Sequence, residues 1–194
     1  SLGIIYEDGK YVARDMNKAI HYYTLASNQN NSDAQFNLGV IYLDGQHVTR
    51  DINKAIHYNT LAANQNNSYA QLNLGFIYLD GQHVTRDINK AIHYYTLAAN
   101  QNNSIAQLHL GIIYLNGKYV TRDINKAIHY YTLAANQNNS IAQLHLGIIY
   151  LNGKYVTRDI NKAIHYYTLA ANQNNSDAQL NLGFIYLDGQ HVTR

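Results

Sequence analysis

A segment of 36 residues repeats along this chain and constrains the fold more than any other feature. A period of this size is typical of repeat arrays, in which each unit packs only against its neighbours. Five periods cover 180 of the 194 residues. The glycine of the segment recurs at Gly3, Gly39, Gly75, Gly111, Gly147 and Gly183. We therefore predict one array over residues 1–194, with partial units at 1–31 and 176–194 and full units at 32–67, 68–103, 104–139 and 140–175.

Each unit begins with a helix, here called helix A, as the unit 68–103 illustrates. Its apolar residues recur at spacings of three and four, which favours a helix over a strand. Ser68 and Gln71 predict a capping box at the start of the helix. Gly75 lies mid-helix, where glycine costs about 1 kcal/mol relative to alanine. We therefore expect a close helix crossing at Gly75 that a side chain would block.

A loop and a second helix, here called helix B, complete the unit. Gly81 is expected to end helix A, because glycine readily adopts the left-handed conformation of a helix stop. Asp87 is the expected N-cap of helix B, which runs to about Gln101. Asn102 makes the turn to the next unit, since asparagine tolerates a positive φ. The predicted fold class is all-α, built from antiparallel helix pairs.

The residues of one unit form a specific motif. Residues 70–99 read Ala-Gln-x-x-Leu-Gly-x-x-Tyr-x-x-Gly-x-x-Val-x-x-Asp-x-x-Lys-Ala-x-x-x-Tyr-x-x-Ala-Ala. The motif resembles the Sel-one-like repeat, a relative of the tetratricopeptide repeat, over essentially the whole chain. The resemblance implies a right-handed α-solenoid, a superhelix whose concave side is lined by helix A and binds other proteins. Some secreted bacterial relatives carry a disulfide in each repeat. This chain has no cysteine, so neither that disulfide nor a reputed penicillin binding carries over.

The differences between the repeats fall on one face of helix A. Residues 109–144 and 145–180 are identical at 35 of 36 positions. The variable positions have offsets of 0, 4, 7 and 11, which share a helix face. We predict that this face binds the partner; the alternative is drift at exposed sites that no partner contacts. The candidate partner-binding residues are Asp33, Asn37, Tyr69, Asn73, Phe76, Ile105, His109, Ile141, His145, Asp177 and Asn181.

Composition and motifs argue against several other functions. A net charge of +2 gives no electrostatic footprint for nucleic acid, and no apolar run approaches the roughly 20 residues of a membrane span. Neither a nucleophile elbow nor a phosphate-binding glycine loop occurs. Histidines recur once per helix B, and stacked helices lie about 8–10 Å apart, too far for one zinc ion. We expect no catalytic site, no cofactor, no metal, no nucleic acid and no membrane partner.

Tyrosine is unusually common, with 19 residues against three phenylalanines and no tryptophan. Asn59 replaces the helix-B tyrosine that stands at Tyr23, Tyr95, Tyr131 and Tyr167. We predict a looser contact at Asn59 and a gain in thermal stability when tyrosine is restored. One further position of helix B holds a leucine in each repeat. We expect these leucines either to form an exposed apolar ladder or to be buried under neighbouring side chains; they are Leu25, Leu61, Leu97, Leu133 and Leu169.

The two ends of the chain lack the polar capping units of natural arrays. We expect either a piece of a longer array or ends that other chains cover, since an open head-to-tail contact builds a fibre. The last helix A is expected to expose Leu180, Leu182, Phe184, Ile185, Tyr186 and Leu187. The predicted function is a non-catalytic scaffold for other proteins. The alternatives are a self-assembling, filament-forming protein and a carbohydrate- or small-molecule-binding surface built on tyrosines.

Overall fold

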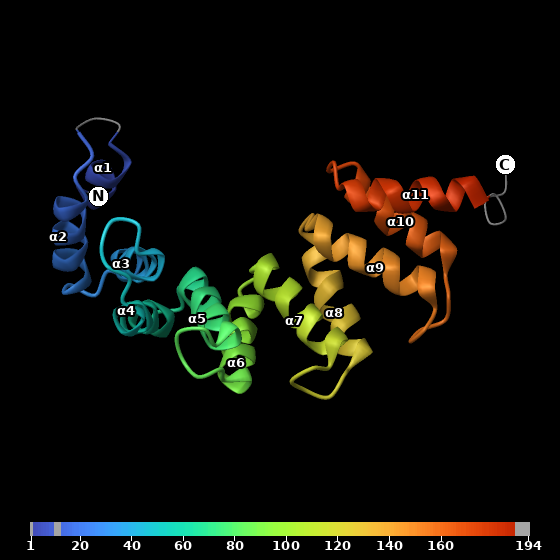
Figure 1. Ribbon diagram of the computed structural model, residues 1–194, viewed down its shortest axis with the longest axis horizontal. Coiled ribbons are helices and arrows are strands. Elements are labelled where there is room, and N and C mark those ends of the chain that lie inside the picture. The colour runs from blue at the N-terminus through green and yellow to red at the C-terminus, as the bar shows by residue number, and fades with distance from the viewer. Residues whose placement is uncertain (1, 10–12, 189–194) are drawn as a thin grey trace. The chain divides into compact units, whose positions relative to one another are not determined.

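The computed structural model describes residues 2–9 and 13–188, which form eleven α-helices and no strand (Figure 1). The chain divides into two compact units, Ser1–Gln101 and Asn102–Arg194. The first unit contains α1 (Leu2–Asp8), α2 (Met16–Ser27), α3 (Ser32–Asp44), α4 (Ile52–Asn64), α5 (Ser68–Asp80) and α6 (Ile88–Asn100). The second contains α7 (Ser104–Asn116), α8 (Ile124–Asn136), α9 (Ser140–Asn152), α10 (Ile160–Ala171) and α11 (Ser176–Asp188). The predicted all-α fold of paired helices is confirmed.

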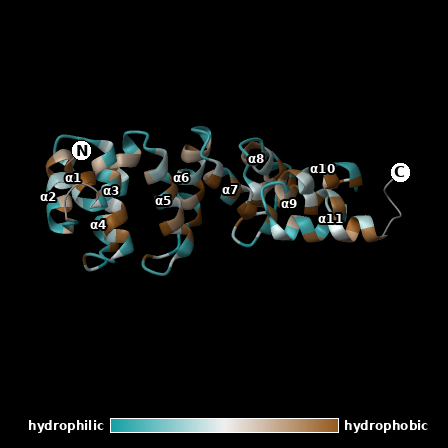
Figure 2. Ribbon diagram, turned by 90° about the horizontal axis from the view of Figure 1, so that it is seen from above, coloured by the Kyte–Doolittle hydropathy of each residue, from teal (hydrophilic) through white to brown (hydrophobic). Residues whose placement is uncertain are grey.

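Odd-numbered helices are helix A and even-numbered helices are helix B. Within the first unit, α3 packs on its own partner α4, and α4 packs in turn on α5. Within the second unit, α8 packs likewise on α7 and α9. Helices A also touch one another, α3 with α5 and α7 with α9. The loops between the paired helices are mainly hydrophilic, whereas the helices carry the apolar residues (Figure 2).

Helix A begins with an asparagine cap, and the predicted capping box is wrong. Asn67 is the N-cap of α5, and its side-chain oxygen accepts from the Ala70 amide at 3.0 Å. Ser68 is therefore the first residue of the helix. Asparagine and serine are comparably good N-caps, so two adjacent candidates left the sequence ambiguous. The same bond recurs from Asn31, Asn103, Asn139 and Asn175.

The glutamine assigned to the capping box instead connects successive repeats. Gln71 is 1% exposed, and its Nε2 donates to the Ala63 carbonyl at the end of α4 at 3.2 Å. Its Oε1 accepts at 2.7 Å from Nε2 of Gln101, the C-cap of its own helix B. The buried amide is thus hydrogen-bonded on both sides, as buried polar groups need to be. Equivalent bonds are made by Gln35 and Gln143.

The other predicted helix ends are confirmed. Gly81 has a φ of +69° at the end of α5. Asp87 is the N-cap of α6, and its side chain accepts from the Lys90 amide at 3.0 Å. The turn asparagines adopt a positive φ, with a value of 62° at Asn66 and 60° at Asn102.

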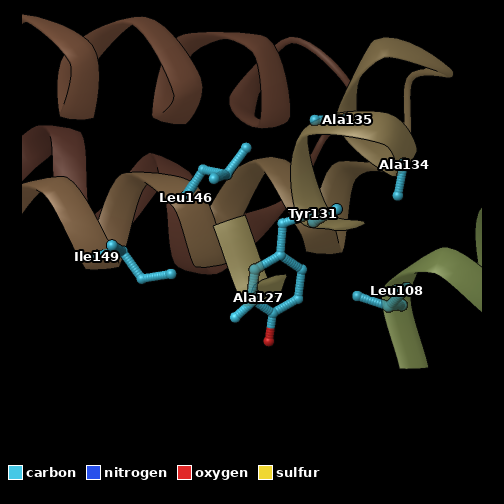
Figure 3. Close-up of a cluster of buried hydrophobic side chains, with 8 residues drawn as sticks. Leu108, Ala127, Tyr131, Ala134, Ala135, Leu146 and Ile149 are labelled. Carbon is cyan, nitrogen blue, oxygen red and sulfur yellow. The ribbon is translucent and has the colours of Figure 1, made fainter. Parts of the chain in front are cut away.

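The close crossing expected at the mid-helix glycine is confirmed. A Cβ atom added to Gly111 of α7 would lie 2.6 Å from Cδ1 and Cε1 of Tyr131 on α8. Tyr131 is fully buried in a cluster with Leu108 of α7 and Leu146 of α9 (Figure 3). The tyrosine of one helix B therefore fills the space between its own helix A and the helix A of the next repeat.

Asn59 occupies the tyrosine position of the repeat 32–67 and is also fully buried. Its Nδ2 donates to the Ala55 carbonyl at 2.9 Å, and its Oδ1 accepts from Asn73 at 3.3 Å. The amide is therefore held by hydrogen bonds where the other repeats place a ring. A Cβ on Gly39 would still approach Asn59 Nδ2 to 2.4 Å, so the glycine keeps its close contact.

The structure answers the open question about the helix-B leucines and partly corrects the prediction of exposure on α11. On helix B, Leu25 is 46% and Leu169 is 36% exposed, whereas the equivalent leucines of α4, α6 and α8 are half-buried. On α11, Leu180, Phe184, Tyr186 and Leu187 are exposed as expected. Ile185 is buried instead, and Leu182 is half-buried, because both pack against the cluster around Tyr167.

Gly111→Ala should destabilise the protein by about 1–3 kcal/mol, because the new methyl group overlaps the Tyr131 ring and forces repacking. Gly183→Ala is the matched control: it has the same place in α11, but nothing lies within 4 Å of its Cβ position. It should raise stability by up to about 1 kcal/mol through helix propensity. Urea and thermal unfolding of both variants measure the difference. Equal effects of the two substitutions would contradict the packing role of the glycine.

Asn59→Tyr should raise the thermal midpoint, by the equivalent of about 1–2 kcal/mol, because a buried ring adds apolar contact. Asn73 would then face a tyrosine from helix B, as Asn37 does beside Tyr23 in the preceding repeat. Thermal unfolding compares the variant with the wild type, and a lower midpoint would show that the two hydrogen bonds of Asn59 matter more than the ring.

Candidate functional site

The variable face of helix A contains both exposed and half-buried residues. The first variable position is exposed, with Tyr69 at 60%, Ile105 at 44% and Ile141 at 48%. The exposed candidates are Asp33, Tyr69, Ile105, Ile141 and Asp177. The half-buried candidates are Asn37, Asn73, Phe76, His109, His145 and Asn181. The first group is therefore the more accessible to a partner.

Three half-buried residues of the second variable position, Asn37, Asn73 and His145, face the buried side chain of the preceding helix B. The His145 ring stacks on Tyr131, with centroids 5.0 Å apart and planes 14° apart. Asn73 donates to Asn59 at 3.3 Å. Asn181 differs, because its Nδ2 donates within α11 to the Asp177 carbonyl at 2.7 Å. Sequence reasoning assigned this position to a partner, whereas much of its surface serves contacts between repeats.

Phe76 also has a packing role. Its ring meets that of Tyr95 on α6 edge to face, at 5.7 Å and 87°. Tyr69 lies more openly and contacts Phe36 of α3, with ring centroids 6.0 Å apart. Nearby, Asn67 Nδ2 donates to the Asp33 carboxylate at 3.4 Å. Tyr69, Phe36 and Asp33 therefore form a patch that spans two successive helices A.

A second set of aromatic contacts lies between helix A and helix B of each repeat. Tyr42 stacks on Tyr58 at 5.9 Å with an interplanar angle of 7°. The Lys54 ammonium lies 4.8 Å from the Tyr42 ring centroid, within the range of a cation–π contact. His57 meets Tyr58 edge-on at 5.2 Å. Tyr42 and its equivalents are therefore half-buried stacking residues and not part of the fully buried core.

The lysine and the histidine that recur on helix B thus both contact the stacked tyrosines. No group of three histidine, cysteine, aspartate or glutamate side chains suited to a metal ion occurs in residues 2–9 and 13–188. Within those same ranges, no helix is both long and apolar enough to span a bilayer.

Sequence reasoning missed an arginine at the end of the loop. Arg122 Nε donates to the Leu115 carbonyl at 2.9 Å, and Nη2 donates to the Asn116 carbonyl at 3.3 Å. It thereby satisfies the last carbonyls of α7, which have no partner within the helix. Its Nη1 donates to the Tyr155 hydroxyl of the next repeat at 2.7 Å. In the first unit, Arg50 makes the corresponding contact with His83 at 3.1 Å.

These arginines border a groove that recurs between the carboxyl ends of successive helices A. In the first unit a groove of about 530 Å³ is lined by Val40, Leu43, Asp44, Arg50, Asn73, Asp80, Gln82 and His83. In the second unit a groove of about 300 Å³ is lined by Leu115, Asn116, Arg122, Ile148, Ile149, Asn152, Lys154 and Tyr155. Six positions are shared, exactly two repeats apart in sequence. The joint change from Asp, Gln and His to Asn, Lys and Tyr was the available sequence signal.

The repeat geometry can be compared with that of known proteins. The family model described as Sel1 repeat matches residues 1–31, 32–67, 68–103, 104–139, 140–175 and 176–194. The chain belongs to the Sel1 repeat family. The resemblance predicted from the motif is therefore confirmed. Sel1-repeat proteins generally serve as scaffolds for protein interactions.

Solved structures of other Sel1-repeat proteins agree. A Sel1 repeat protein from Oxalobacter formigenes is 35% identical, with a TM-score of 0.86 over 97% of this chain and 77% of that one. The protective antigen c5321 of uropathogenic Escherichia coli, described as displaying an SLR fold, is 34% identical. Its TM-score is 0.93 over 98% of this chain, which spans 41% of that one. A comparison with curated proteins finds no match.

Helicobacter pylori cysteine rich protein B is more distant. It is 30% identical, with a TM-score of 0.53 over 69% of this chain and 96% of that one. The present Sel1-repeat protein has no cysteine, so its repeats are held by non-covalent contacts alone.

The two histidines of the variable face should make stability depend on pH. Burial lowers the pKa of both His109 and His145. Because the folded protein favours the neutral ring, the stabilisation is complete above the unfolded pKa of about 6.5 and is lost as the pH falls below it. Urea unfolding from about pH 7.5 to about pH 5 should show this loss.

His109→Asn with His145→Asn should flatten this pH dependence, since asparagine stands at the same position in three other repeats. His129→Asn, at an exposed position on α8, is the control and should leave the slope unchanged. If the free energy of unfolding of the double variant depends on pH as steeply as that of the wild type, His109 and His145 are not the source of the pH dependence.

Proposed function

We propose that this Sel1-repeat protein is a non-catalytic scaffold that binds other proteins through the variable face of helix A. The observation that carries the proposal is the exposed apolar residue at the first variable position of three successive repeats, Tyr69, Ile105 and Ile141. Aromatic and apolar side chains exposed on an ordered helix are typical of contact surfaces.

The packing within each unit supports the same face. Helix A contacts the next helix A, α3 with α5 and α7 with α9. Such contacts are expected on the inner side of a curved array, where helices converge and a partner can touch several repeats at once. The Tyr69–Phe36 contact makes one continuous patch from two repeats.

Selection of peptides from a random library on the immobilised full chain tests the proposal. Tyr69→Ala should weaken the binding of selected peptides by about 1–2 kcal/mol, as expected for an exposed aromatic anchor. His93→Ala, on the exposed side of α6, is the control and should leave the affinity unchanged. Peptides whose affinity is unaffected by Tyr69→Ala, Ile105→Ala and Ile141→Ala would contradict binding at this face.

Self-association is the second candidate, and one observation favours it. Leu187 is 85% and Phe184 is 60% exposed on α11, and the glycine notch at Gly183 is open. Sedimentation velocity over a range of concentrations distinguishes the two functions. A scaffold stays monomeric without its partner, whereas a self-assembling protein grows with concentration and loses this behaviour in Phe184→Asp.

A further inference from the structure

These two grooves at the carboxyl ends of helices A share six lining positions and carry opposite charge. In the first unit, Asp44 and Asp80 line the groove with a single cationic side chain, Arg50. In the second unit, asparagine replaces both aspartates, and Lys154 joins Arg122. The first groove thus has an excess of one negative charge, and the second has two positive charges and no acid. This reversal accompanies the differences between the repeats at the other variable positions of helix A.

Within residues 2–9 and 13–188, no acidic side chain forms an ion pair with the cations of the second groove. Arg122 donates to two backbone carbonyls and a hydroxyl, all of which are uncharged. Lys154 lies over the Tyr155 ring at 5.1 Å and takes part in none of the ion pairs of the described residues. The five ion pairs there all join a helix-B lysine to its N-cap aspartate. The carboxyl ends of α7 and α9 each contribute about half a negative charge, which two cations exceed.

Tyr155 reports the positive potential at this rim. Its pKa is lowered, first by the hydrogen bond from Lys154 and then by the charges of Arg122 and Lys154. An anion in the same place experiences the same attraction. The side-chain amides of Asn116 and Asn152 are exposed and add hydrogen-bond donors to the rim.

The floor of the second groove is apolar, formed by Leu115, Ile148 and Ile149. Beneath it, the Tyr131 hydroxyl is fully buried and has no hydrogen-bond partner. The first repeat shows a partner for such a hydroxyl: Tyr23 donates to the Glu7 carboxylate, and Glu7 stands at the position that Leu115 occupies in α7. A carboxylate at this end of helix A is therefore compatible with the fold.

We propose that the groove of the second unit binds an acidic, extended segment of a partner protein, with an aspartate or glutamate at the Arg122–Lys154 rim and an apolar neighbour on the floor. The inference rests on the proposed scaffold function and names the chemistry of the partner. An extended segment suits the groove, because alternate side chains can enter it while the backbone stays outside. The first groove, with its two aspartates, excludes the same segment by charge repulsion.

The repeats provide their own substitutions for a test. The variant Asn116→Asp, Asn152→Asp, Lys154→Gln gives the second groove the residues of the first at three positions, all of which the fold already accepts at Asp44, Asp80 and Gln82. The probe is a peptide with an acetylated N-terminus and an amidated C-terminus that contains two glutamates among apolar residues. It is chosen from the library peptides that bind the wild-type chain. The variant should raise its Kd on the order of tenfold, measured by calorimetry at low salt.

The control variant has the same net charge change at a distant place. Asn64→Asp, Asn100→Asp and Asn136→Asp lie at the exposed last residues of α4, α6 and α8. In the antiparallel pair of α7 and α8, Asn136 lies a full helix, about 20 Å, from the groove. This variant should change the Kd less than twofold. The reverse exchange in the first groove, Asp44→Asn, Asp80→Asn, Gln82→Lys, should add one site for the acidic peptide.

The outcomes separate this inference from the scaffold function. Enriched peptides that depend on Tyr69 but are unaffected by both groove exchanges overturn the charge assignment and leave the scaffold function intact. A groove exchange that alters the binding of inorganic sulfate and not of the peptide also overturns it, because the groove would then hold a free anion only. Failure of the wild-type chain to enrich any peptide overturns both proposals.

Discussion

The fold depends on one contact, the insertion of a helix-B side chain between two helices A. Tyr131 fills this space, and Gly111 makes room for it because a Cβ atom would overlap the ring. Neither helix of a single repeat can cover Tyr131 alone, since Leu146 of the next repeat forms the opposite wall. The hydrophobic effect therefore acts between repeats as much as within them. The ring is buried only when the next repeat is present, so each repeat that carries this tyrosine depends on its neighbour.

Polar contacts reinforce this dependence and fix the spacing of the repeats. Gln71 is buried and bonds to the carbonyl of Ala63 in one repeat and to Gln101 in its own. Leaving such a group unpaired costs about 1–3 kcal/mol, so repeats that slip relative to one another lose stability. Apolar contact thus provides most of the stabilisation, and the glutamine bonds make it specific to one register.

The sequence predicts the elements well and their contacts less well. The cap at Asp87 and the turn at Asn102 are fixed by local backbone chemistry, and both were predicted correctly. The close crossing at Gly75 was also predicted, because a glycine inside a helix is unfavourable unless a neighbour needs the space. Gln71 was assigned to a local cap, because its true partners lie in the preceding helix B and 30 residues ahead. The face of helix A was predicted as one stripe, but the exposure of Tyr69 and the burial of His145 depend on the neighbouring repeat. The grooves were missed for the same reason, since Arg122 and Tyr155 are 33 residues apart.

The central claim is that a single repeat cannot fold without neighbours. Circular dichroism of the isolated segment 140–175, compared with the intact chain, tests it most directly. Two helices of about 13 residues are marginal in water, and Tyr167 would have a covering helix on only one side. The account predicts low helicity and no cooperative thermal transition for the segment, beside a cooperative transition for the intact chain. A cooperative transition of the isolated segment near the midpoint of the intact chain would contradict it.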